Sequence, residues 1–125
     1  MSGSTATQNM YPYQNEPSWS RSEKAIARKV FEGALTRELQ EIMRQAKQMA
    51  NQIKEPADVW ELERYLTQRR KDIDRKYDFR LSRLTRVLGT LLYEGRVSEE
   101  DLRVLREDKM KAIRSAATVL SDDVA

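Results

Sequence analysis

The stretch from Ser20 to Lys54 constrains the fold most, because it contains no proline and repeats apolar residues at helical spacing. Steps of three and four residues separate the apolar positions, as in a heptad seam. These positions are Phe31, Leu35, Leu39, Ile42, Ala46, Met49 and Ile53. The pattern predicts one helix of roughly 33 residues, about 50 Å long at 1.5 Å per residue. A compact chain of this size can scarcely cover such a seam by itself.

We expect a second copy of the chain to cover this seam, which makes the protein an elongated homodimer. The predicted dimer interface consists of Leu35, Leu39, Ile42, Met43, Ala46, Met49 and Ile53. The alternative is that the seam packs wholly on later helices of the same chain, since three heptads are short for a coiled coil. Both possibilities remain open from the sequence.

Start signals mark the first two helices. Ser20, followed three residues later by Glu23, has the spacing of a capping box at the start of the long helix. Pro56 cannot donate a backbone hydrogen bond but suits a first helical turn, so a second helix should start near residue 57. That helix should weaken within residues 75–80, where Tyr, Asp and Phe are poorer helix formers.

Two further signals follow. A third helix with leucines between residues 81 and 92 should end at Gly95, which is placed as a C-terminal cap. Ser98 can cap a fourth helix, which we expect to continue to about Leu120. The predicted fold is therefore all-α, a long N-terminal helix plus a small bundle of three further helices.

The expected domain organisation is an N-terminal tail over residues 1–18, a single helical domain over 19–120 and a frayed end over 121–125. The tail is rich in Ser, Thr, Gln, Asn and Pro, which predicts disorder. Tyr11 and Tyr13, together with Trp19 directly after the tail, could make it a docking peptide, but a flexible terminus is the simpler interpretation.

The sequence contains no histidine and no cysteine, which excludes histidine bases, Ser-His-Asp triads and zinc sites built on these residues. Asp72, Asp74 and Asp78 do not fit a calcium loop, since its glycine position holds Tyr77 and its final glutamate position holds Arg83. A glycine-rich phosphate loop is also missing from the sequence. We therefore expect no catalytic residue, no metal and no cofactor.

Basic residues are frequent between residues 64 and 86, but acidic residues alternate with them, and the chain has 23 basic against 20 acidic residues. This pattern favours a salt-bridged helix surface over a nucleic-acid interface. Nowhere does the sequence approach the eighteen or so continuous apolar residues of a membrane span. We expect a cytoplasmic protein that contacts neither nucleic acid nor membrane.

Four segments resemble the cyanobacterial fluorescence recovery protein family in order and spacing. They read SWSRSE, VWELERYLTQRRKDIDRKYDFR, LLYEG and EEDLRVLREDKMKAI, and the resemblance spans about residues 18–118. It implies an all-helical, non-enzymatic homodimer that binds photoactivated orange carotenoid protein. Binding would speed the return of that receptor to its dark orange state and so end the quenching of phycobilisome fluorescence.

The same resemblance implies the partner-binding residues. Trp60 and Arg70 stand where the family has a functional Trp and a functional Arg. Glu63 and Arg64 occupy the positions of a His-Asp pair, so an acidic contact has become basic, and Arg86 stands at about the position of a Phe. A diverged homodimer that binds another protein, such as a related carotenoid-binding protein, is therefore the alternative function.

Two of these residues also have simpler interpretations. Trp60 could be an aromatic at the edge of the core, because aromatic residues on helix seams most often pack. Arg70 could form an intrahelical pair with Asp74, worth a few tenths of a kcal/mol.

Overall fold

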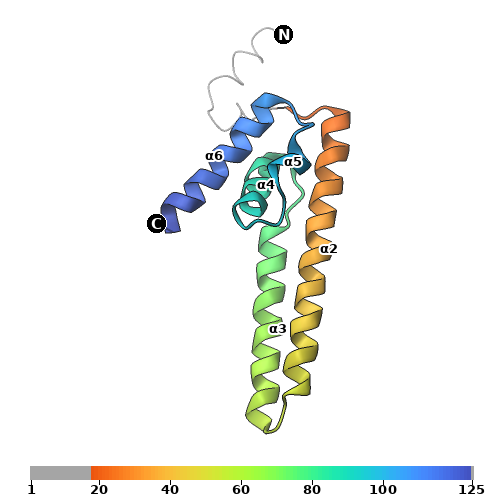
Figure 1. The fold of residues 1–125 in the computed structure, drawn as a ribbon, viewed down its shortest axis with the longest axis vertical. Coiled ribbons are helices and arrows are strands. Elements are labelled where there is room, and N and C mark those ends of the chain that lie inside the picture. Colours follow the sequence, from red (N-terminus) through yellow and green to blue (C-terminus); the bar gives the residue numbers. More distant parts are fainter. Residues whose placement is uncertain (1–17, 125) are drawn as a thin grey trace.

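The structure is a computed structural model that describes residues 18–124, with the side chains of residues 18–122. Within that range it contains helices and connecting segments but no strand, so the all-α prediction is confirmed (Figure 1). The helices are α2 (Arg21–Asn51), α3 (Pro56–Lys76), the 3-10 helix η2 (Leu81–Arg83), α4 (Leu84–Tyr93), α5 (Glu99–Leu102) and α6 (Glu107–Val124). Tyr11, Tyr13 and almost all of the predicted tail lie outside the described residues.

Helices α2 and α3 run side by side in opposite directions and form an extended hairpin, which we call the stalk (Figure 1). With 31 residues, α2 is about 46 Å long at 1.5 Å per residue. Its start is the predicted capping box, in which Ser20 Oγ accepts from the Glu23 amide at 3.2 Å. At the hairpin turn Asp58 Oδ2 accepts from the Lys54 and Glu55 amides at 2.9 and 3.1 Å, and Pro56 occupies the first turn as predicted.

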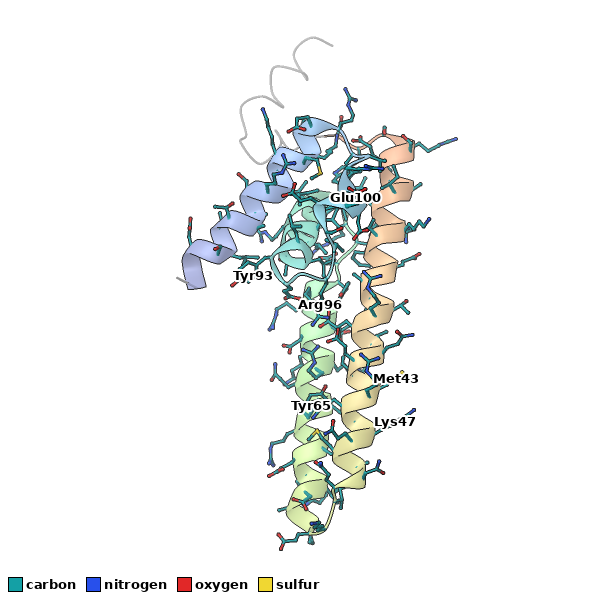
Figure 2. All side chains as sticks on the ribbon, viewed as in Figure 1. Met43, Lys47, Tyr65, Tyr93, Arg96 and Glu100 are labelled. Carbon is teal, nitrogen blue, oxygen red and sulfur yellow. The ribbon has the colours of Figure 1, made fainter. Side chains whose placement is uncertain are left out.

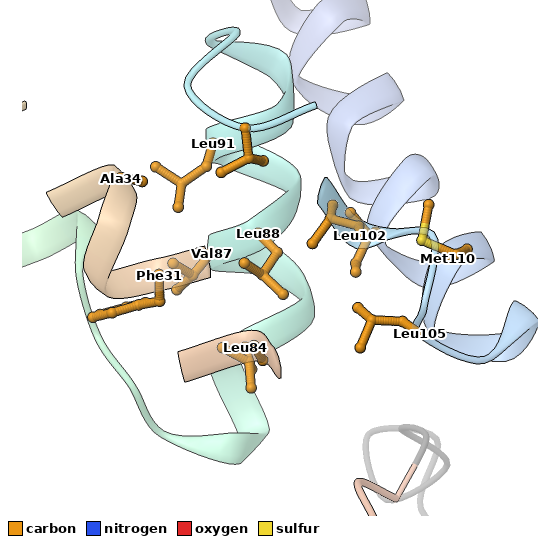
Figure 3. Close-up of a cluster of buried hydrophobic side chains, with 12 residues drawn as sticks. Phe31, Ala34, Leu84, Val87, Leu88, Leu91, Leu102, Leu105 and Met110 are labelled. Carbon is orange, nitrogen blue, oxygen red and sulfur yellow. The ribbon is translucent and has the colours of Figure 1, made fainter. Parts of the chain in front are cut away.

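Residues 77–124 fold against the first half of α2 and form what we call the head (Figure 1). Its core joins α2 to α4, α5 and α6 (Figure 3). The buried apolar residues are Ala27, Phe31, Ala34, Leu84, Val87, Leu88, Leu91, Val97, Leu102, Leu105, Met110 and Ile113. Phe31 of the predicted seam is therefore a core residue of its own chain.

The segment that links stalk and head is held by aromatic packing. Tyr77 ends α3, and its ring lies 5.3 Å from that of Phe31 in an edge-to-face arrangement. Phe79 packs on the same ring at 4.9 Å, and the Arg28 guanidinium lies 4.1 Å from the Phe79 ring centre. The helix break predicted within residues 75–80 is confirmed, and Phe31 fixes where the chain goes after it.

The third helix ends as the glycine predicted. Gly95 has φ +75°, a conformation that residues with a Cβ rarely adopt. Its amide donates to the Leu92 carbonyl at 3.1 Å, and the Arg96 amide donates to the Leu91 carbonyl at 2.8 Å. These two bonds form a Schellman motif, which satisfies the last carbonyls of α4.

The prediction of one continuous fourth helix after Ser98 is wrong, because α5 ends at Leu102 and α6 begins at Glu107. The buried carboxylate of Glu23 accepts a hydrogen bond from the Arg106 amide at 3.1 Å and so fixes the chain between the two helices. Glu23 also forms a 3.1 Å ion pair with Lys109, which is itself only 1% exposed. This cluster ties the start of α6 to the start of α2.

Burial alone would raise the pKa of Glu23. Amide hydrogen bonds from Ser20 and Arg106, together with the contact to Lys109, outweigh burial and lower that pKa to about 2. The Lys109 Nζ also lies 5.5 Å from the ring centre of Trp19, which packs against the core. Beyond this anchor, α6 continues to Val124, four residues past the expected end at Leu120.

We predict opposite effects of alanine at two helical glycines. A Cβ on Gly89 would lie 2.5 Å from the Ala116 Cβ and 3.0 Å from the Ile113 carbonyl oxygen, so Gly89→Ala should push α4 from α6 and cost about 1–3 kcal/mol. A Cβ on Gly33 would meet only the end of the Arg37 side chain at 3.3 Å. Gly33→Ala should therefore gain about 0.5–1 kcal/mol from helix propensity.

Urea unfolding followed by circular dichroism measures both changes. Equal effects of the two alanines would contradict the close packing of α4 on α6.

Candidate protein-binding surfaces

The junction of stalk and head is built around Glu38, a fully buried carboxylate on α2. It accepts hydrogen bonds from Arg69 Nη2 at 2.7 Å, Lys76 Nζ at 2.9 Å and the Tyr77 hydroxyl at 2.7 Å. The Arg96 Nε lies 3.2 Å from Glu38 Oε1. One side chain therefore holds α3, the linker and the segment after α4 against α2.

A second layer of ion pairs surrounds this carboxylate. Lys76 pairs with Glu94 at 2.8 Å, and Arg96 pairs with Glu94 at 2.8 Å and with Glu41 at 2.9 Å. The Arg37 side chain donates to the Arg96 carbonyl at 2.8 Å. Among the described residues, no buried side-chain polar atom lacks a hydrogen-bond partner. The charged groups of the junction are thus paired with one another within the protein.

The electrostatics of the junction keep Glu38 ionised. Burial raises the pKa of a carboxyl group, but hydrogen bonds from Lys76, Tyr77 and Arg69 outweigh burial and hold the pKa of Glu38 below its ordinary value. Burial and the bond to Glu38 raise the pKa of the Tyr77 hydroxyl, which stays protonated as a donor. Glu38 has only one signal in the sequence, its position seven residues after Phe31 on the same helix face, and this position alone does not predict a buried carboxylate.

Four of the five predicted partner-binding residues lie exposed on α3. Trp60 is 59% exposed, which contradicts its interpretation as a core-edge residue. Trp60, Glu63 and Arg70 form a row along α3 with Thr67 and Asp74. We call this row of five residues the outer stripe. Arg64, also exposed, lies on the neighbouring face of α3.

Contacts within the outer stripe are weak. Thr67 donates its hydroxyl proton to Glu63 at 2.9 Å. Arg70 and Asp74 approach only to 4.0 Å, with side chains 85% and 73% exposed. Such a pair contributes little stability, so both charges can be used by a partner.

Arg86 lies apart from the outer stripe, on α4 in the head. It lines an open cleft of about 450 Å³ between α3 and α4, and none of the outer-stripe residues lines this cleft. The structure therefore divides the predicted partner-binding residues between two surfaces.

The residues of the predicted dimer seam differ in their exposure. Leu35, Ile42, Ala46 and Met49 are half-buried, whereas Leu39 is 42%, Met43 57% and Ile53 37% exposed. Figure 2 shows Met43 on the side of α2 turned away from α3. The chain's own helices thus leave part of the seam uncovered. Val59 and Leu66 on α3 are also exposed, at 42% and 40%.

Among residues 18–124, no group of three or more acidic side chains could hold a metal ion. None of the helices in that part of the chain combines the length and the apolar character of a membrane span.

The fold is that of a small all-helical protein whose stalk exposes a charged stripe and an apolar row. The sequence profile of the family described as photoprotection regulator fluorescence recovery protein matches residues 19–117. The chain belongs to this family, a family of regulators, and the resemblance found in the sequence is confirmed.

Individual relatives agree with this membership. A fluorescence recovery protein from Synechocystis is 37% identical over 102 residues, which cover 82% of this chain and 94% of that protein. The solved structure of the Fremyella diplosiphon fluorescence recovery protein is 35% identical with a TM-score of 0.78, covering 81% of this chain and 99% of that one. The solved Synechocystis structure is 37% identical, with the same coverage and TM-score.

We predict that Glu38→Gln destabilises the protein by about 3 kcal/mol, because it leaves partly buried cationic partners without their counter-charge. Since folding lowers the pKa of Glu38, its contribution is present above the ordinary value of 4.5 and is lost as the pH falls below it. The variant should therefore lose less stability on acidification than the unmodified chain.

Urea unfolding at pH 7 and at pH 4 measures both effects. The matched control is Glu41→Gln, an exposed partner of Arg96 at the same junction, which should cost under about 1 kcal/mol. Equal losses in the two variants would show that Glu38 does not hold the junction.

Proposed function

We propose that this protein binds photoactivated orange carotenoid protein in the cytoplasm and accelerates its return to the dark orange state, by binding alone and without catalytic residues. Membership of the fluorescence recovery protein family supports the regulatory class. The exposure of both Trp60 and Arg70 on the outer stripe of α3 carries the proposal of a protein-binding surface.

These two residue types suit a protein interface. Tryptophan and arginine are enriched among the residues whose truncation costs most binding energy. Hydration of an exposed indole ring is unfavourable in free energy, and burial of the ring against a partner removes this cost. Because Arg70 has only a 4.0 Å contact with Asp74, it can turn to a partner's carboxylate at little cost.

Binding accelerates the recovery of a receptor only if it is stronger at the transition state than to the photoactivated state. A protein that bound the photoactivated state most tightly would instead prolong it. The stalk presents the outer stripe on one face of α3, which packs beside α2 and is tied to it by the ion pair of Arg69 with Glu38. The receptor's contact surface must then change toward the shape that fits the outer stripe.

We also propose that the protein acts as a homodimer, with the exposed part of the seam at the interface. Leu39, Met43 and Ile53 lie on α2 with large exposed fractions. Burial of such side chains contributes about 1.5–3 kcal/mol each when it is complete. The seam extends over much of the stalk, as an elongated interface between two stalks would need.

The proposed dimer predicts a mass of twice the 14.6 kDa of one chain by light scattering. Leu39→Glu should convert it to monomer, because the interface would bury a carboxylate without a partner. Gln48→Glu is the control: residue 48 lies about 180° around α2 from Leu39, so this variant should stay dimeric. A monomer mass at every concentration of the unmodified chain would refute the dimer.

The regulatory proposal is tested by mixing the protein with photoactivated orange carotenoid protein and timing the loss of red absorbance. The unmodified chain should shorten the decay in proportion to its concentration until the effect saturates. Trp60→Ala and Arg70→Gln should each reduce the acceleration about tenfold or more. Lys47→Gln, on the exposed surface of α2, should leave it unchanged (Figure 2).

A second candidate function is a diverged homodimer with a different protein partner, which the exposed Arg64 favours. An arginine in place of an acidic contact replaces attraction with repulsion if the partner surface is otherwise kept. If the unmodified chain leaves the decay unchanged while Arg64→Asp shortens it, this second function holds. If neither shortens it, the carotenoid protein is not the partner of this fold surface.

A further inference from the structure

The cleft beside Arg86 carries more positive than negative charge. Five basic and three acidic side chains line it, together with Val87 and Thr90. The charged residues are Arg69, Arg75, Lys76, Arg83 and Arg86, with Asp72, Asp78 and Glu94. Excess positive charge in a concave surface attracts anionic groups.

The acidic side chains of the cleft are all engaged by basic side chains other than Arg83 and Arg86. Distances of 2.5–3.2 Å separate the charged atoms of these pairs. The pairs are Arg69–Asp72, Arg75–Asp72, Lys76–Glu94 and Arg80–Asp78. The carboxylates of the cleft are therefore occupied and compete weakly for further cations.

Arg83 and Arg86 form no ion pair with any described residue within 4.0 Å, in contrast to the other bases of the cleft. Arg83 does act electrostatically on Asp78, but the pKa of Asp78 is lowered first by its hydrogen bond with Arg80 and only last by Arg83. Three residues apart at the start of α4, the two guanidinium groups lie on one helix face. Each can donate two parallel hydrogen bonds to a carboxylate.

A second cleft adjoins the first across these two arginines. Its volume is about 760 Å³, and it shares Arg83, Arg86 and Thr90 with the first cleft. On its far side α6 contributes the apolar side chains of Ala116, Val119 and Leu120. Val119 is 58% exposed, although it is a large apolar residue. Two arginines without an ion pair to any described residue thus lie next to exposed apolar surface over α4.

We propose that the two clefts together bind an acidic amphipathic segment of a protein partner. Its carboxylates pair with Arg83 and Arg86, and its apolar side chains lie against Val119 and Leu120. The inference deepens the proposed function, since it assumes that the protein works by binding another protein, and it names the chemistry of a contact on the head separate from the outer stripe.

Charge complementarity and exposure select this occupant over two others. Small ligands bind in cavities that bury most of their surface, whereas Arg83 and Arg86 are exposed at the rim of an open cleft. A nucleic acid would bring phosphates close to Asp72, Asp78 and Glu94 and would leave the apolar cleft unused. A protein segment uses both halves and brings its own surface to exclude water.

The test uses a fluorescent synthetic helical peptide with glutamates one turn apart on one face and leucines on the other. Fluorescence anisotropy at low salt should show saturable binding to the full chain. Arg83→Gln/Arg86→Gln should weaken binding about 30-fold or more, since two charge-assisted contacts are lost. Arg44→Gln/Lys47→Gln, the same change of charge at the same spacing on exposed α2, should change it less than about twofold.

Two further variants separate the halves of the site. Arg83→Glu/Arg86→Glu should lose the acidic peptide and gain a matched peptide with lysines in place of glutamates. Val119→Ser should weaken the acidic peptide severalfold and leave inorganic phosphate without effect as a competitor. Unchanged circular dichroism establishes that each variant is folded, as expected for exposed positions.

Three results would overturn the inference. They are no saturable binding, equal weakening by the α2 control pair, and displacement of the peptide by inorganic phosphate that carries the same total negative charge as the peptide. The peptide assay contains no carotenoid protein, so its outcome is separate from that of the recovery assay. Peptide binding without accelerated recovery would withdraw the proposed receptor and keep the head site. Accelerated recovery without peptide binding would do the reverse.

Discussion

The buried carboxylate of Glu38 is the interaction on which the arrangement of this protein depends. An ionised group without water must be paired, and loss of one partner leaves the other buried and uncompensated. Glu38 satisfies this requirement with Arg69 and Lys76 from α3, Tyr77 from the linker and Arg96 from the segment after α4. The end of α3 with its linker and the segment after α4, both distant from α2 in sequence, must therefore meet at one point of α2.

Two kinds of surface result from this arrangement. The stalk presents a charged stripe with an exposed Trp60 and an apolar row that its own helices leave uncovered. The head presents Arg83 and Arg86 between a polar and an apolar cleft. The head surface rests on helices that share the buried core, whereas the outer stripe lies on α3, which has no buried residue and is tied to α2 by the ion pairs of Glu38.

Local signals in the sequence predicted most helix boundaries, because caps act within one turn. Ser20, Pro56, Gly95 and Ser98 each do what their residue type predicts. The break between α5 and α6 was missed because its cause, the Arg106 amide bound by Glu23, joins residues 83 apart in the chain. Only a step of five between the buried Leu105 and Met110 hinted at the break.

The sequence by itself determined that the chain is helical, where most helices begin and end, that histidine and cysteine chemistry is excluded, and which family it resembles. These properties follow from residue types and spacings along a single strand of chain. Only the tertiary structure decided that Glu38 is a buried junction, that Trp60 is exposed and that Arg86 faces a cleft away from the outer stripe. The physical reason is that burial and ion pairing depend on which helix faces meet, and periodicity along one helix does not specify its neighbour.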